Sequence, residues 1–81
     1  MIYRLHQDRT VRAVRESLPQ AAADELKLAL DGILVDPKAG TQPYGIDDGI
    51  TRTLVLSRTV VVLLVNDETR MITLLSVTHL G

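Results

Sequence analysis

The feature that most constrains this chain is an uninterrupted run of six apolar residues, Val60–Val65, four of which are β-branched. It lies between two polar stretches, Ser57–Thr59 and Asn66–Thr69. A short apolar run bounded by turn-forming residues is typical of a β-strand that is buried on both faces, and β-branched side chains favour the strand conformation. The sequence therefore predicts a central strand of a sheet at this position.

Further strand-like segments surround this run. Residues 51–56 and 71–78 are rich in aliphatic and β-branched side chains, and each is joined to the run by a polar connection of three to five residues. Short polar connections between strands favour hairpins. The pattern predicts a three-stranded antiparallel meander in the second half of the chain. Residues 2–6 alternate weakly and add a first strand.

The residues between the first strand and the meander have helical periodicity. Residues 8–17 carry apolar side chains at helical spacing and predict a short amphipathic helix, for which Asp8 is a suitable N-cap. A second helix is predicted over 19–35. A proline can stand at its beginning, because proline is tolerated in the first turn of a helix. The helix ends at Asp36, because the residue before a proline is disfavoured in the helical region. Residues 37–49 then form a loop of about thirteen residues, a length that is often functional.

The order strand, helix, helix, loop and three strands predicts one α+β domain over 1–81. Two amphipathic helices pack on a four-stranded, largely antiparallel sheet. Helices alone do not explain a central strand that is apolar on both faces. The long loop, a second copy of the chain or a bound partner segment are the candidates for covering the second face.

Composition limits the classes of function. The formal net charge is −1, and the chain has two Tyr but no Phe or Trp, which argues against a basic nucleic-acid footprint and against stacking of single-stranded bases. There is no Cys, and two histidines without a third ligand make a weak metal site, so we expect no metal and no cofactor. The chain contains no apolar run long enough to predict a leader or a membrane span, so a cytoplasmic location is expected.

Several features together resemble the RelE/ParE superfamily of bacterial type II toxins. They are Leu18-Pro19 before the second helix, Asp36-Pro37 after it, a loop containing Gly40, Pro43, Tyr44 and Gly45, and a terminal meander that ends at residues 76–81. The resemblance covers essentially the whole chain. It implies a cytoplasmic toxin that a cognate antitoxin neutralises by wrapping a segment around it. RelE-like members cleave mRNA on the ribosome, whereas ParE-like members inhibit DNA gyrase.

Three residues are candidates for catalysis if the chain is a ribonuclease. In YoeB-like members a histidine lies just after the last strand, and His79 occupies that place, where it would act as a general acid. Arg52 and Arg58 would hold phosphate. The arginine that these nucleases carry early in the central strand corresponds to about Val60, and no lysine follows Lys38. This incomplete set leaves open whether the chain is an enzyme, a gyrase inhibitor without catalysis, or a non-toxic interaction module.

A basic stripe on the first predicted helix is the largest local positive feature. It consists of Arg9, Arg12 and Arg15, which recur every three residues. Such a stripe is most often a solvated helix face, and it could also meet nucleic acid or an acidic partner segment.

Overall fold

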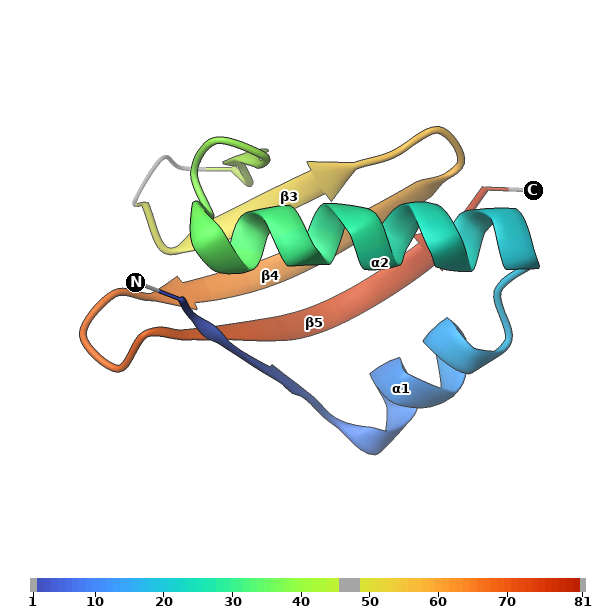
Figure 1. Ribbon diagram of the computed structural model, residues 1–81, viewed down its shortest axis with the longest axis horizontal. Helices are drawn as coiled ribbons and strands as arrows, with labels where there is room; N and C mark the ends of the chain where they lie inside the picture. Colours follow the sequence, from blue (N-terminus) through green and yellow to red (C-terminus); the bar gives the residue numbers. More distant parts are fainter. Residues whose placement is uncertain (1, 46–48, 81) are drawn as a thin grey trace.

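The computed structural model describes residues 2–45 and 49–80, and it places two helices against one face of a five-stranded sheet (Figure 1). In chain order the elements are β1 (Arg4–Gln7), α1 (Arg9–Glu16), α2 (Gln20–Val35), β2 (Gln42–Pro43), β3 (Thr51–Val55), β4 (Thr59–Asn66) and β5 (Met71–His79). The sheet order is β1-β5-β4-β3-β2. Strand β1 is parallel to β5, and the other neighbours are antiparallel. The predicted α+β class, the meander and the central place of β4 are confirmed.

The strand count differs from the prediction of four, because part of the predicted loop 37–49 forms a strand. Strand β2 has only two residues and pairs with β3, with Gln42 opposite Thr53. Proline suits this outer position, where an amide hydrogen is not needed. The hydroxyl of Thr41 donates a 2.6 Å hydrogen bond to the carbonyl oxygen of Pro37, which holds the approach to β2. Asp47 and Asp48, in the rest of that predicted loop, lie outside the described residues.

The helices begin and end close to the predicted residues. The Asp8 carboxylate accepts a 2.8 Å hydrogen bond from the Val11 amide and is the N-cap of α1, as predicted. Helix α2 ends at Val35, and its C-cap Asp36 has an extended backbone conformation before Pro37. No helix among residues 2–45 and 49–80 is both long enough and apolar enough to cross a membrane.

The hydrophobic core lies between the helices and one face of the sheet, here called the covered face. Strand β4 supplies Val61, Leu63 and Val65, which are at most 2% exposed. Helix α2 packs on them through Leu26, Leu30 and Ile33, and α1 contributes Val11. Figure 1 shows α2 lying along the sheet in front of the strands.

The prediction that β4 is buried on both faces is wrong for its second face. Val60, Val62 and Leu64 alternate with the buried residues and are only half-buried. With their partners on β3 and β5, and with Met71 at the start of β5, they form what we call the open face, which comprises Thr51, Thr53, Val55, Val60, Val62, Leu64, Met71, Thr73, Ser76 and Thr78. Strand β2 extends the sheet edgewise, so it does not cover this face.

A β-bulge in β5 decides which face the end of the chain joins. Val62 is opposite Ser76, whereas the next residue of β4, Leu63, is opposite Leu74, so Leu75 has no partner on β4. An extra residue resets the alternation of side chains. Because of it, Val77 and His79 lie on the covered face with Leu74, although simple alternation from Leu74 would place them on the open face.

Candidate functional site

A hollow of about 590 Å³ lies where the first turns of α2, the β3–β4 turn and the end of β5 meet. We call it the helix–turn hollow. The described residues that line it are Pro19, Ala21, Ala22, Glu25, Ser57, Arg58 and His79. It contains two of the three predicted site residues, Arg58 and His79. Helix α2 supplies an apolar wall and the Glu25 carboxylate, and the other functional groups come from the β3–β4 turn and the end of β5.

His79 is the last residue of β5 and pairs with Thr59, the first residue of β4. Its Nδ1 atom lies 3.4 Å from the hydroxyl oxygen of Thr59, which is fully buried. The ring itself is half-buried and lines the hollow. A histidine that lines a hollow in this way is a candidate general acid or base.

Arg58 lies in the β3–β4 turn, whose backbone is fixed on two sides. The Leu56 amide donates to the Thr59 carbonyl oxygen at 2.8 Å and closes the turn. The Leu80 amide donates to the Arg58 carbonyl oxygen at 2.7 Å and ties the turn to the residue after His79. The Arg58 side chain is exposed and forms no hydrogen bond or ion pair with the described residues. A guanidinium presented in this way is available to an anionic ligand.

Glu25 of α2 is a third functional side chain of the hollow. Its Oε2 atom accepts hydrogen bonds from the Ser57 hydroxyl at 2.8 Å and from the Ser57 amide at 3.2 Å. The two residues are 32 positions apart in the chain. No local sequence pattern indicates a contact over this separation, so sequence reasoning missed Glu25.

Arg52, the third predicted site residue, lies elsewhere. It lies on the covered face with Leu54 and is 8% exposed. Its Nε atom donates to the Thr41 hydroxyl oxygen at 2.9 Å, and its Nη2 atom donates to the Thr41 carbonyl oxygen at 2.8 Å. Its partner on β4 is Leu63, four positions from Thr59, which corresponds to about 13 Å along the strand. These contacts hold the segment before β2, and they do not bring Arg52 to the helix–turn hollow.

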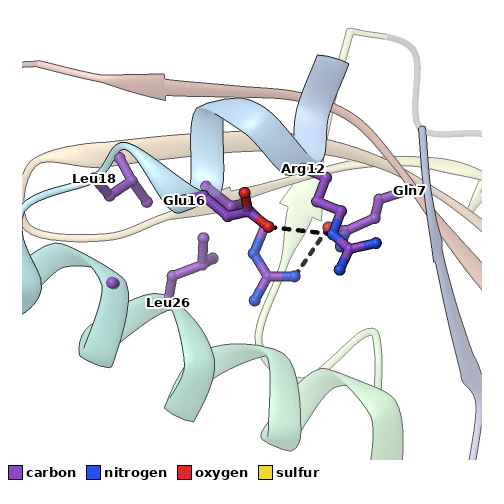
Figure 2. Close-up of a pocket in the computed structure, with 7 residues that line it drawn as sticks. Gln7, Arg12, Glu16, Leu18 and Leu26 are labelled. Atoms are coloured by element: carbon purple, nitrogen blue, oxygen red, sulfur yellow. Dashed lines mark hydrogen bonds and ion pairs between the residues drawn. The ribbon is translucent and has the colours of Figure 1, made fainter. Parts of the chain in front are cut away.

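A smaller hollow of about 220 Å³ separates α1 from α2 (Figure 2). Leu18 and Leu26 form its apolar part, and the Arg12 and Gln7 side chains lie at its polar end. Arg12 is paired with Glu16 at 3.2 Å, and Arg15 donates to the Gln7 amide oxygen at 2.9 Å. Two arginines of the predicted basic stripe are therefore already engaged by side chains of this chain.

At the other end of the sheet, three side chains connect the start of the chain to the β4–β5 turn. The Tyr3 hydroxyl donates to Asp67 at 2.6 Å, and Arg70 donates to the Tyr3 oxygen at 3.2 Å. The Arg70 guanidinium also lies 5.4 Å from the centre of the Tyr3 ring. The hydrogen bond to Asp67 raises the pKa of Tyr3 above its ordinary value. This cluster joins two chain segments, the start of the chain and the β4–β5 turn.

Metal ligands do not gather among the described residues, where no group of three or more His, Cys, Asp or Glu side chains occurs. His6 is opposite Thr73, six positions from His79 along β5, so the two histidines lie about 20 Å apart. The two histidines therefore do not meet at one site.

Comparison with solved structures identifies the fold. A chain of a RelBE toxin–antitoxin complex from Mycobacterium tuberculosis is 19% identical, with a TM-score of 0.81 over 98% of this chain and 99% of that chain. A chain of the archaeal RelE–RelB complex from Pyrococcus horikoshii is 22% identical, with a TM-score of 0.81 over 100% of this chain and 98% of that chain. A mutant E. coli RelE toxin in complex with an antitoxin peptide is 26% identical, with a TM-score of 0.77 over 95% of this chain and 82% of that chain.

No protein-family model and no curated protein sequence matches the chain. The structural likeness nevertheless extends over nearly the whole chain at TM-scores of about 0.8. The chain has the fold of the RelE toxins, which confirms the predicted resemblance. A particular closeness to YoeB-like members is not among these findings.

Proposed function

We propose that this chain is the toxin of a bacterial type II toxin–antitoxin pair. The observation that carries the proposal is a fold shared over 95% or more of the chain with RelE, which has been solved both as an isolated toxin and in complexes with its antitoxin. The proposal places the chain in the cytoplasm, where the ribosome and DNA gyrase, the targets of such toxins, are located.

The reaction that the helix–turn hollow supports best is cleavage of ribosome-bound mRNA. In this reaction the 2′-hydroxyl gives its proton to water as its oxygen attacks the neighbouring phosphorus, a 2′,3′-cyclic phosphate forms, the bond to the 5′-oxygen breaks, and that oxygen receives a proton. His79 is the proton donor in our proposal, and the free guanidinium of Arg58 stabilises the extra negative charge on the phosphorane. Arg52 has no part in this scheme, because its guanidinium contacts Thr41 in the interior.

One observation favours a second candidate, a toxin that inhibits DNA gyrase without catalysis. Arg58 is the one cationic side chain among the described residues that line the hollow apart from His79. The open face of β3, β4 and β5 carries Thr, Val, Leu, Met and Ser, and Val60 stands where related nucleases are expected to carry an arginine. A gyrase inhibitor or a non-toxic interaction module needs no set of cationic catalytic side chains. Its binding to its partner would survive the loss of His79.

The proposed partner in either case is a cognate antitoxin, and the open face is the surface we assign to it. Val55 is 56% exposed there, and the three half-buried apolar residues of β4 lie beside it. An apolar face bounded by threonines suits an extended or helical apolar segment. A second copy of this chain is the competing occupant, and a homodimer through this face would be seen as a concentration-dependent change of mass.

The test is growth of a bacterial culture after induction of this chain, beside His79→Ala and Arg58→Ala, with soluble protein measured in each case. Arrest that both substitutions relieve, together with cleaved mRNA on isolated ribosomes, supports the nuclease. Lys38→Ala is a matched control, because it removes a cation from outside the hollow.

Arrest that persists in His79→Ala and Arg58→Ala would transfer the proposal to gyrase, which a supercoiling assay tests directly. Soluble wild-type protein without any arrest would contradict the toxin proposal and leave the interaction module. In that case binding of the protein encoded next to this gene, with a rise in melting temperature, is the remaining expectation.

A further inference from the structure

We infer that Glu25 of α2 is a positioning residue for the helix–turn hollow, and that it sets the place of Arg58 by holding Ser57. The inference deepens the proposed ribonuclease function and rests on it for its consequence in catalysis. The sequence and the proposed mechanism assign no role to helix α2. The structure shows that one of its carboxylates is bound to the turn that carries the phosphate-binding side chain.

The first step of the argument is that the contact is directed at the turn itself. Both donors to Glu25 belong to Ser57, one from its backbone and one from its side chain, at 3.2 and 2.8 Å. Hydrogen bonds to an ionised carboxylate are stronger than neutral ones. A pair of donors from one residue fixes its position and the direction of the peptide that follows, which is that of Arg58.

The second step is that the remaining backbone contacts hold Arg58 from the opposite side. The Leu80 amide holds the Arg58 carbonyl oxygen, and Thr59, which follows Arg58, lies against the His79 ring. Arg58 is thus placed between a helix contact through Ser57 and a strand contact through Leu80. The same chain of contacts includes His79, so the distance between the two proposed functional groups depends on the turn.

The third step is that Glu25 is not needed to attach the helix to the sheet. Helix α2 is fixed by Leu26, Leu30 and Ile33, which are at most 3% exposed. Glu25 is half-buried at the rim of the hollow and lies outside that cluster. Removal of its carboxylate is therefore expected to loosen the turn and to leave the fold intact.

The experiment compares Glu25→Ala, Glu25→Gln and Asp24→Ala in the full-length chain. Gln retains an oxygen that accepts from Ser57 and removes the charge. Asp24→Ala is the matched control, because it removes a carboxylate from the neighbouring position, where Asp24 contacts only Gln20 of its own helix among the described residues. A direct acid–base role of Glu25 would make Gln as damaging as Ala, whereas a positioning role lets Gln restore function.

The first measurement is amide hydrogen exchange, which does not depend on any activity. Glu25→Ala is expected to speed exchange of the Leu80 amide at least about tenfold, with the Leu63 amide in β4 unchanged, because the local opening of the turn becomes easier. Glu25→Gln and Asp24→Ala are expected to stay within about threefold of the wild type. Unchanged Leu80 exchange in Glu25→Ala would overturn the inference.

The second measurement is cleavage of ribosome-bound mRNA, where kcat/KM should fall about tenfold in Glu25→Ala and recover in Glu25→Gln. Ser57→Ala removes only the hydroxyl donor and should cost no more than Glu25→Ala, and the double variant should cost no more than Glu25→Ala alone. Additive losses, or a Gln variant as poor as Ala, would overturn the positioning role. A wild-type chain that cleaves no mRNA would refute the proposed function, and the exchange measurement would then decide the inference on Glu25 by itself.

Discussion

Neighbouring residues of β4 have the same chemistry and different surroundings, which makes the two faces of the sheet directly comparable. Val61, Leu63 and Val65 lie under α2 and have at most 2% of their surface exposed. Val60, Val62 and Leu64 alternate with them and are half-buried, since no helix covers the open face. The difference arises from what packs on the strand and owes nothing to the residue types.

The comparison shows which residues the fold needs and which it leaves for other uses. A sheet with one face in the core normally carries polar residues on the other face. Here the second face of β4 is as apolar as the first, although folding buries it only in part. Apolar side chains that the isolated chain leaves partly exposed are expected to become buried in a complex, which agrees with the antitoxin surface that we propose.

Two adjacent leucines give the sharpest test of this comparison and the largest expected effect. Leu63 is fully buried on the covered face, and Leu64 is half-buried on the open face. Leu63→Ala should lower the free energy of unfolding by about 2–5 kcal/mol, because it leaves a cavity, and Leu64→Ala by about 1 kcal/mol or less. Urea denaturation of both variants measures the difference. Equal losses would mean that the open face is covered in solution, for example by a second copy.

Two arginines extend the comparison from apolar to charged side chains. The expected change in the free energy of unfolding is smaller than for Leu63→Ala. Arg52 is buried and donates twice to Thr41, whereas Arg58 is exposed. Arg52→Met should cost about 2 kcal/mol of unfolding free energy, because Thr41 loses two charge-assisted hydrogen bonds inside the protein. Arg58→Met should change it by less than about 0.5 kcal/mol. A larger stability loss in Arg58→Met than in Arg52→Met would contradict the assignment of structural and functional arginines.

Much of the fold could be predicted from the sequence, because its signals are local. The apolar run 60–65, the helical spacing before it, the Asp8 cap and the stop at Asp36 each depend on a few neighbouring residues. Strand β2 could not be predicted, because a two-residue strand has no periodicity and depends on contacts that distant residues such as Arg52 make. Periodicity also gives no information on which of two apolar faces a helix will cover.

The candidate site was predicted in part, for reasons that particular residues make plain. Arg58 and His79 were both named, but their meeting in one hollow depends on the bulge at Leu75, which moves the end of β5 to the covered face. A bulge has no dependable sequence signal in an apolar strand. Arg52 was named because an arginine among apolar residues suggests phosphate binding. Its guanidinium instead donates hydrogen bonds inside the protein. Glu25 was missed because its partner lies 32 residues away.

The smallest effect is expected at the rim of the covered face, where Tyr3 donates to Asp67. This hydrogen bond raises the pKa of Tyr3 above its ordinary value of 10.0, so the folded chain keeps the phenolic proton to a higher pH than the unfolded chain does. The stability that the bond contributes is fully present below pH 10 and declines as the pH rises through the raised pKa. Tyr3→Phe should remove this decline, whereas Tyr44→Phe, at an exposed tyrosine, should retain it. Urea midpoints between pH 8 and about pH 11 measure the difference. A steeper alkaline loss in Tyr3→Phe than in the wild type would show that the proton stabilises the unfolded chain instead.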